Sequence, residues 1–136
     1  MPVTINIPKQ RKLDLLVSAL EGGSNYWYDN ARIYGNSFGR SLGRIEELCK
    51  TKYPDYHKLE AAPFVGGILA IDVQDSEEVE PEQRTRLLTE ADFDRALQLM
   101  VDKYPHHFFD FLQENDDATT ADVYLQLAMF GELIFG

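Results

Sequence analysis

Residues 22–44 constrain the fold of this 136-residue chain more than any other stretch, because they hold five of its nine glycines. The segment reads GGSNYWYDNARIYGNSFGRSLGR and lies between two stretches with helical periodicity. Glycine loses more backbone entropy on folding than any other residue, so helix and strand interiors avoid it. The segment is therefore predicted to be a shaped loop on a more rigid scaffold, where functional residues are often found.

Three short segments are predicted to be strands. Alternating apolar and polar residues over 3–7 are typical of a half-buried strand. A second short strand is expected around 26–28. The apolar, β-branched run 68–73 is predicted to be the central strand, and its pairing with the 3–7 strand is compatible with the sequence. The charged stretch 74–86 is expected to be a turn or loop.

Two amphipathic helices are predicted on either side of the glycine-rich segment. Leu13, Leu16 and Leu20 lie on one face of the first helix. Gly22 follows as the expected C-terminal glycine with left-handed backbone dihedrals. The second helix is expected from about Ser41 to Thr51. Its predicted core residues are Leu42, Ile45, Leu48 and Cys49.

Helical patterns also dominate the last fifty or so residues. Thr89-x-x-Asp92 resembles a capping box, and Thr119-x-x-Asp122 repeats that pattern before the last predicted helix. Within that helix, Gly131 either allows close packing or marks the helix end. The whole chain, 1–136, is predicted to be one α+β domain, with a short sheet packed by roughly five helices and a helical C-terminal half.

Composition points to a soluble intracellular protein. Cys49 is the one cysteine, so no intramolecular disulfide can form and a reducing compartment is expected. The N-terminus lacks the apolar core of a signal peptide. No apolar run approaches the roughly 18–20 residues of a membrane span.

Charge is distributed unevenly along the chain. The net charge is −10, with +3 over residues 31–58 and −13 over residues 59–136. An acidic protein is repelled by the phosphate backbone, so generic nucleic-acid binding is not expected. A local basic patch can still hold a small anion. The acidic half is otherwise a solvated surface that aids solubility.

Two segments together resemble a family. One is EGGSNYWY at residues 21–28; the other is the C-terminal stretch with ENDD, TADV and FGE at 114–132. The pair resembles a group of small uncharacterised accessory proteins encoded by bacteriophages, prophages and other mobile elements. The resemblance covers both ends of the chain and leaves the middle unmatched. It implies an accessory role in the cytoplasm of a bacterial host, and no particular chemistry.

The arginines of the glycine-rich segment suggest an anion site. Arg40 and Arg44 flank the predicted helix start at Ser41, and Arg32 lies upstream. Glycines let backbone N–H groups approach an anion, a helix N-terminus favours negative charge, and arginine recognises phosphate with two hydrogen bonds. The P-loop order of residues is absent. The alternative is a surface loop with solvated arginines.

The aromatic residues of the same segment could stack on a nucleobase. Their alternative role is packing in the core or against a second subunit. The predicted ligand-binding residues are Asn25, Tyr26, Trp27, Tyr28, Arg32, Arg40, Ser41 and Arg44.

Other candidates favour structural roles. Asp116, Asp117 and Asp122 are explained as turn and cap residues rather than as metal ligands. Adjacent histidines at 106–107 point about 100° apart on a helix and do not chelate one ion easily. Cys49 lies on an apolar helix face, where a thiol is usually inert. No catalytic residue, cofactor or metal is predicted.

Three functional hypotheses follow. The first is a non-enzymatic phage protein that captures a small anionic, nucleotide-like ligand used in host antiviral defence, with Arg40 and Arg44 on phosphate and an aromatic on the base. A homo-oligomer would suit such capture. The second is an acidic protein–protein interaction module that mimics nucleic acid and inhibits a host enzyme. The third is an oligomeric assembly factor that associates through its C-terminal helix.

Overall fold

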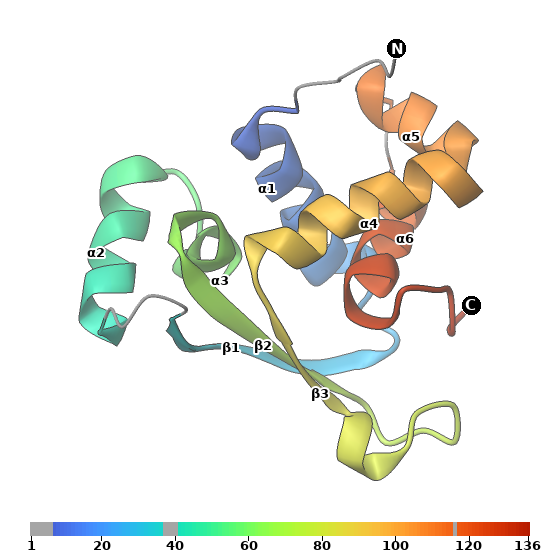
Figure 1. Cartoon of the computed structure of the whole chain (residues 1–136), viewed down its shortest axis with the longest axis horizontal. Coiled ribbons are helices and arrows are strands. Elements are labelled where there is room, and N and C mark those ends of the chain that lie inside the picture. Colours follow the sequence, from blue (N-terminus) through green and yellow to red (C-terminus); the bar gives the residue numbers. More distant parts are fainter. Residues whose placement is uncertain (1–6, 37–40, 116) are drawn as a thin grey trace.

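The computed structural model describes residues 7–36, 41–115 and 117–136 and has an α+β architecture, as predicted (Figure 1). The α-helices in this part of the chain are α1 (Lys9–Ser18), α2 (Leu42–Lys52), α3 (Lys58–Ala61), α4 (Glu90–Lys103), α5 (Pro105–Leu112) and α6 (Ala118–Phe130). Three shorter helical turns are η1 (Ala19–Gly23), η2 (Ala62–Val65) and η3 (Pro81–Gln83). The strands are β1 (Tyr28–Asn36), β2 (Gly67–Val73) and β3 (Thr85–Leu88).

The three strands form an antiparallel sheet in the order β1-β2-β3. The predicted central position of the 68–73 run is therefore confirmed. Leu69 and Ile71 of β2 are fully buried and belong to the core. Because β2 has partners on both sides over residues 69–72, the proposed pairing with a 3–7 strand is wrong there. Residues 3–6 themselves lie outside the described part of the chain.

The prediction of a loop throughout 22–44 is wrong, since β1 spans nine of these residues. Ala31 and Ile33 pair with Ile71 and Leu69 of β2 and pack against the core, which stabilises the strand despite its glycine. Two register shifts interrupt the pairing, and Gly35 lies at one of them. Bulges of this kind tolerate glycine better than regular ladder positions do. The strand expected at 26–28 begins only at its last residue, and the loop expected over 74–86 includes the start of β3.

Helix α6 is the central helix of the domain. Every residue from Thr120 to Met129 is buried, and α1 and α4 pack against it. Aromatic rings of Phe64, Phe93 and Tyr124 form a row through the core, with neighbouring centroids 5.5 Å apart. Because α6 is already covered within the chain, it does not offer the free apolar face that the assembly-factor hypothesis requires.

Helix ends agree with the sequence in part. The capping box at the start of α4 is confirmed, with Thr89 N donating to Asp92 at 2.8 Å. Gly131 ends α6 with a left-handed φ of 73°. The second predicted capping pair is wrong, because Asp117 caps α6 by accepting from Thr120 N at 3.0 Å. That leaves Asp122 one turn inside the helix.

The glycines at the end of α1 do not behave as predicted. Instead of a left-handed Gly22, the chain continues through the π-helical turn η1 to Gly23. A Cβ on Gly23 would lie 2.3 Å from the backbone oxygen of Ala118, so only glycine allows η1 to pack this closely on α6.

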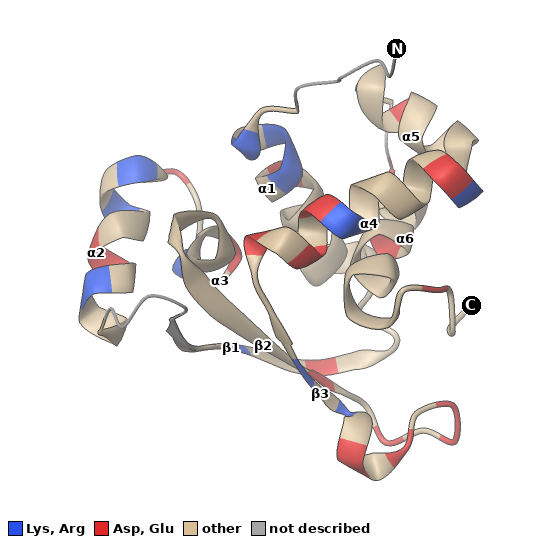
Figure 2. Ribbon diagram, viewed as in Figure 1, with Lys and Arg blue, Asp and Glu red and all other residues tan. Residues whose placement is uncertain are grey.

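Charged side chains separate along the molecule. Lysines and arginines gather on α2 at one end, whereas acidic residues follow the 74–84 loop at the other (Figure 2).

The core residues predicted for α2 are confirmed only in part. Ile45 and Cys49 are fully buried, Leu48 is half-buried and Leu42 is exposed. Among the described residues, no helix has the length and apolar character needed to cross a membrane.

Candidate functional site

The two segments that carry the family resemblance meet at the carboxylate of Asp122. Its Oδ1 accepts hydrogen bonds from Ser24 Oγ at 2.8 Å and from Trp27 Nε1 at 2.7 Å. Its Oδ2 accepts from Tyr26 OH at 2.5 Å and from Gln126 Nε2 at 3.1 Å. Three residues of the EGGSNYWY motif thus converge on the aspartate of the TADV motif.

Burial makes this cluster depend on its own hydrogen bonds. Asp122 is 8% exposed, Ser24 is fully buried and Trp27 is 2% exposed. A buried carboxylate is tolerated when its lone pairs are satisfied, as these four donors achieve. Burial, together with the hydrogen bond to Asp122, raises the pKa of Tyr26 to about 12. Tyr26 therefore remains a neutral donor throughout the physiological range.

The C-terminal tail closes over the same cluster. Gln126 Oε1 accepts from the backbone N–H groups of Ile134 and Phe135, both at 2.9 Å. Gln126 Nε2 also donates to Phe135 O at 3.2 Å. The Phe135 ring stacks on Trp27 with centroids 5.4 Å apart and planes 5° apart. The tail is thus tied to both motif segments.

A pocket of about 420 Å³ opens beside this cluster, and we call it the Asp122 pocket. It is lined by the two glycines of η1, the first turns of α6, His107 of α5 and the C-terminal tail. Its polar side chains are Tyr26, His107, Thr119, Asp122 and Gln126, and its larger apolar side chains are Val123, Leu133 and Phe135. Among the described residues, no lysine or arginine lines it.

His107 is the titratable group at the edge of the pocket. Its Nδ1 lies 2.9 Å from Thr120 Oγ1. Burial, and then the charge of neighbouring His106, lowers the pKa of His107 below its usual 6.5, although Asp110 and Asp117 oppose this. The ring is therefore neutral at pH 7, and Nε2 is the nitrogen left to face a ligand.

The predicted aromatic residues have different environments. Tyr26 is 51% exposed, so part of its ring can meet a ligand. Trp27 is corrected as a ligand-binding residue, because its ring is buried against Phe135 and its N–H is used by Asp122. Tyr28 is half-buried, and its hydroxyl donates to Leu20 O. Asn25 is exposed, and its backbone oxygen accepts from Gln74.

The predicted cationic residues lie elsewhere. Arg32 on β1 forms an ion pair with Asp72, which also accepts from Thr85 Oγ1 at 2.6 Å. The hydrogen bond from Thr85, followed by the contact with Arg32, lowers the pKa of Asp72 below its usual value. Ser41 caps α2 by accepting from Arg44 N at 3.2 Å, and the Arg44 side chain pairs with Glu47 at 3.2 Å.

Strand β1 separates the aromatic and cationic parts of the predicted site. Tyr26 precedes the strand and Arg44 follows it, while the third predicted cation, Arg40, lies outside the described residues. Nine residues of strand extend over about 25–30 Å. Figure 1 accordingly shows α2 and the C-terminal tail at opposite ends of the molecule. One chain therefore does not bring Tyr26 and Arg44 to the same small ligand.

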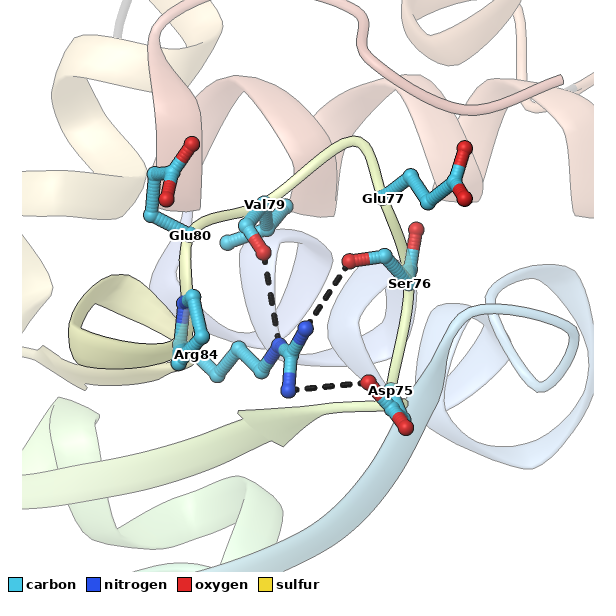
Figure 3. A pocket seen from close by; sticks show the side chains of 7 residues that line it. Asp75, Ser76, Glu77, Val79, Glu80 and Arg84 are labelled. Atoms are coloured by element: carbon cyan, nitrogen blue, oxygen red, sulfur yellow. Dashed lines mark hydrogen bonds and ion pairs between the residues drawn. The ribbon is translucent and has the colours of Figure 1, made fainter.

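A second candidate surface is the acidic loop, defined as residues 75–84 (Figure 3). Arg84 holds it from inside: Nε donates to Val79 O at 3.3 Å, Nη2 donates to Ser76 O at 3.0 Å, and Nη1 pairs with Asp75 at 2.9 Å. The loop hollow has a volume of about 490 Å³. Within the described chain, no ion pair neutralises the four glutamates of this loop, which are Glu77, Glu78, Glu80 and Glu82.

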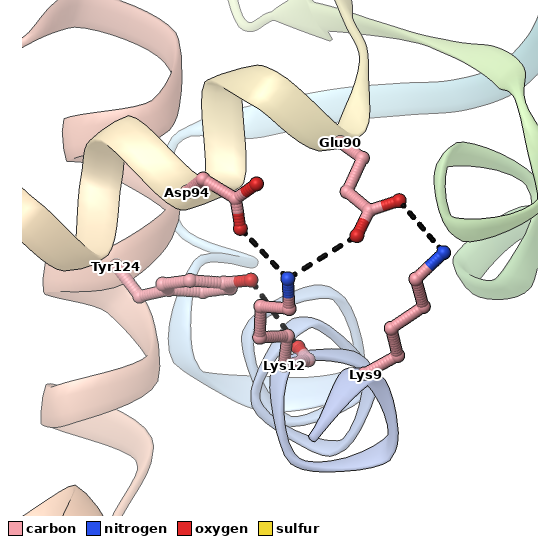
Figure 4. Close-up of polar contacts among 5 residues, drawn as sticks. All are labelled: Lys9, Lys12, Glu90, Asp94 and Tyr124. Carbon is pink, nitrogen blue, oxygen red and sulfur yellow. Dashed lines mark hydrogen bonds and ion pairs between the residues drawn. The ribbon is translucent and has the colours of Figure 1, made fainter. Parts of the chain in front are cut away.

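A buried lysine forms a third polar cluster, which is structural (Figure 4). Lys12 Nζ lies 2.7 Å from Asp94 and 3.2 Å from Glu90, and Lys9 also pairs with Glu90 at 3.2 Å. Burial alone lowers the pKa of Lys12, but the two carboxylates outweigh it and raise the pKa above its usual value. Tyr124 OH donates to Lys12 O at 3.3 Å. With its charge fully paired, this cluster joins α1 to α4 and α6.

Among the described residues, no group of three or more His, Cys, Asp or Glu side chains lies close enough together to hold a metal ion. Comparison with protein-family models, curated proteins and solved structures found no match to the chain. The phage-family resemblance therefore stays a prediction.

Sequence reasoning missed Gln126 as a functional candidate and assigned His107 a structural role. Gln126 lies four residues after Asp122, so both project from one face of α6. Two polar residues at this spacing in an otherwise apolar helix are the signal that points to a buried polar cluster. His107 has no comparable sequence signal, because α5 and α6 meet only in the folded chain.

Proposed function

We propose that this chain is a non-enzymatic accessory protein of bacteriophage origin that sequesters a small, nucleotide-like ligand in the Asp122 pocket and so acts on a host antiviral defence system. The observation that carries the proposal is the convergence of both family segments on one pocket, beside the half-exposed ring of Tyr26. The pocket volume of about 420 Å³ is within the range typical of small-molecule sites.

The state of the polar groups favours binding over catalysis. A general base needs a lone pair directed at its substrate. Both oxygens of Asp122 are instead occupied by four protein donors, and the Nδ1 atom of His107 is engaged by Thr120. These groups hold the walls of the pocket in place. Preorganised walls reduce the entropy cost of binding.

The anionic part of the proposed ligand requires a second source of charge. Arg44 and Ser41 at the start of α2 lie too far from Tyr26 to act on the same molecule within one chain. A homo-oligomer that places α2 of one copy outside the Asp122 pocket of another would supply this charge to phosphates of the ligand that extend well beyond the pocket. This arrangement is part of the proposal.

Mass spectrometry of molecules released from the purified protein is the first test. Protein purified from bacteria, uninfected and phage-infected, is denatured gently, and native mass spectrometry reports the oligomer alongside. We expect a stoichiometric nucleotide-like molecule in at least one preparation. Tyr26→Ala should lose it, whereas the matched control Tyr34→Ala, at a tyrosine on β1 that is 60% exposed, should retain it. Empty protein from both preparations would contradict ligand capture.

The acidic loop favours a second candidate function, an interaction module that binds a basic surface of a host enzyme. Its support is the set of three contacts by which Arg84 holds this loop, together with the four glutamates of the loop, none of which forms an ion pair among the described residues. Binding should fall steeply as salt is raised to about 0.5 M, where exposed charges are largely screened.

Two triple variants that change the net charge equally test whether the position of the charges matters for this second candidate function. Glutamines at Glu77, Glu80 and Glu82 remove three charges from the acidic loop. Asp102→Asn, Glu114→Gln and Glu132→Gln remove three exposed charges elsewhere. Only the first variant should lose the partner in a pull-down of host proteins, and equal losses would argue against a specific role for the loop.

A further inference from the structure

We infer that the Asp122 pocket recognises the uncharged, planar nitrogen heterocycle of its ligand, a nucleobase or nucleoside, and that it does not hold phosphate. The inference rests on the proposed ligand capture and names the chemistry of that site. It departs from the sequence-based expectation, in which arginines of the same segment hold a phosphate beside the stacked base.

The charges around the pocket disfavour an anion. Asp122 contributes a carboxylate to the lining, and the described lining residues include no lysine or arginine. Asp110 and Asp117 are near enough to His107 to raise its pKa, so further negative charge lies close to this side of the pocket. A phosphate would meet repulsion here without a compensating cation.

The start of α6 is not free to replace that cation. Helix N-termini bind phosphate through unpaired N–H groups. In this chain the side chain of Asp117 already accepts from Thr120 N at 3.0 Å. Backbone hydrogen bonds from this first turn lower the pKa of Asp117 below its usual value, which keeps the cap ionised. The Asp117 carboxylate therefore already occupies the place at the N-terminus of α6 where a phosphate would bind.

The walls suit a flat, partly apolar molecule. Tyr26, a residue that is 51% exposed, contributes an aromatic ring to the lining, and Val123, Leu133 and Phe135 add apolar surface. An aromatic ring beside apolar side chains is a surface on which a heterocycle can stack, whichever substituents the heterocycle carries.

Neutral polar groups of the pocket can form hydrogen bonds with the edge of such a ring. His107 is uncharged at pH 7, and Thr120 occupies its Nδ1, so Nε2 can pair with a heterocycle N–H or ring nitrogen according to tautomer. The exposed side chain of Thr119 lies in the same lining and can both donate and accept. Uncharged groups of this kind match a base edge better than they match a phosphate.

Titration calorimetry with paired probes tests the inference. Adenosine, guanosine, cytidine and uridine are compared with their 5′-monophosphates on the full-length protein. We expect at least one nucleoside to bind, and its monophosphate to bind at least about fivefold more weakly, as for an added anion without a partner. Raising the salt concentration should reduce this difference in affinity, because salt screens the repulsion between the phosphate and the acidic residues near the pocket.

Three variants assign binding to the pocket. Tyr26→Leu should weaken nucleoside binding about tenfold, the size of one lost stacking contact. Thr119→Val, at an exposed position that should leave folding intact, should weaken it about threefold to tenfold through a lost hydrogen bond. Tyr34→Leu should remain within about twofold of wild type, since surface changes away from a site have little effect. Circular dichroism confirms that each variant is folded.

The possible outcomes separate this inference from the proposed function. A monophosphate that binds as tightly as its nucleoside, or more tightly, overturns the inference and leaves ligand capture standing. Nucleoside binding that survives both Tyr26→Leu and Thr119→Val overturns the assignment to this pocket. If no nucleoside or nucleotide binds while mass spectrometry recovers another stoichiometric molecule, the heterocycle class is wrong. If nothing binds and nothing is recovered, both proposals fail.

Discussion

Replacing Asp122 by alanine would test whether one carboxylate holds the two ends of the chain together. The change removes the acceptor for Ser24 and Trp27, which are 0% and 2% exposed and cannot turn to water. Each buried donor left without a partner costs about 1–3 kcal/mol. Tyr26 is half-exposed and can be rehydrated. We expect a total loss of about 4 kcal/mol, the sum for two buried donors left without their acceptor.

Asparagine at the same position should cost less. One oxygen remains to accept from Ser24 and Trp27, and the hydroxyl of Tyr26 can rotate to accept from the new amide. Gln126 Nε2 would then face the new amide NH2 group, which is also a donor. Gln126 cannot turn its own oxygen toward that amide, because the oxygen accepts from two backbone N–H groups of the tail. The expected loss is about 2 kcal/mol, from one unfavourable contact and the lost charge assistance.

Urea unfolding followed by circular dichroism measures these losses. In a chain of this size, a loss of about 4 kcal/mol corresponds to a fall in Tm of roughly 12–20 °C. Asp102→Ala, an exposed aspartate on α4, is the matched control and should change stability by less than about 0.5 kcal/mol. If Asp122→Ala is no more destabilising than this control, the reasoning is refuted.

A double-mutant cycle sharpens the result. Ser24→Ala should destabilise the wild type by about 1 kcal/mol. In the Asp122→Ala background the same change removes an orphaned donor, so it should cost nothing or stabilise. Additive losses would show that Ser24 and Asp122 act independently, contrary to the hydrogen bond between them.

Three further predictions concern the tail and two titratable groups. Phe135→Ala should destabilise by about 2 kcal/mol and shift the emission of Trp27, the one tryptophan, to longer wavelength, because the stacked ring that covers it is lost; an unshifted spectrum would argue against that cover. Burial raises the pKa of Glu60 above its usual 4.5, so the folded state binds the proton more tightly and stability falls as pH rises from 4.5 through the raised value. Glu60→Gln should therefore flatten that decline and stabilise the protein at pH 7 by about 1 kcal/mol in urea titrations. An unchanged pH profile would contradict the burial of this carboxylate, whose Oε2 has no hydrogen-bond partner and lies 3.7 Å from His57 Nδ1. For His107 the pKa is lowered by burial, so the unfolded state takes up protons first and stability falls as pH drops below 6.5. His107→Gln should lessen that acid destabilisation between pH 7 and 5, and a steeper fall would reverse the assignment.

Sequence patterns predicted the features that depend on neighbours along the chain. The capping box at Thr89 and the buried strand over 68–73 each follow from local geometry or from a short apolar run. For Gly131 the sequence left two alternatives, and the structure shows that the helix ends there. The same local reasoning failed for β1. Its glycine and polar residues are unfavourable for a strand in isolation, but hydrogen bonds to β2 and burial of Ile33 outweigh that preference.

The candidate site shows the same division. The sequence by itself determined the α+β class and the helical C-terminal half, and it singled out the EGGSNYWY motif as a candidate. Only the tertiary structure decided that this motif faces Asp122, about a hundred residues away, and that Arg44 lies at the far end of β1. Side-chain partners across such distances depend on how helices pack, which short-range periodicity does not encode. For that reason Asp122 has the pattern of a helix cap in the sequence and is a buried hydrogen-bond acceptor in the fold.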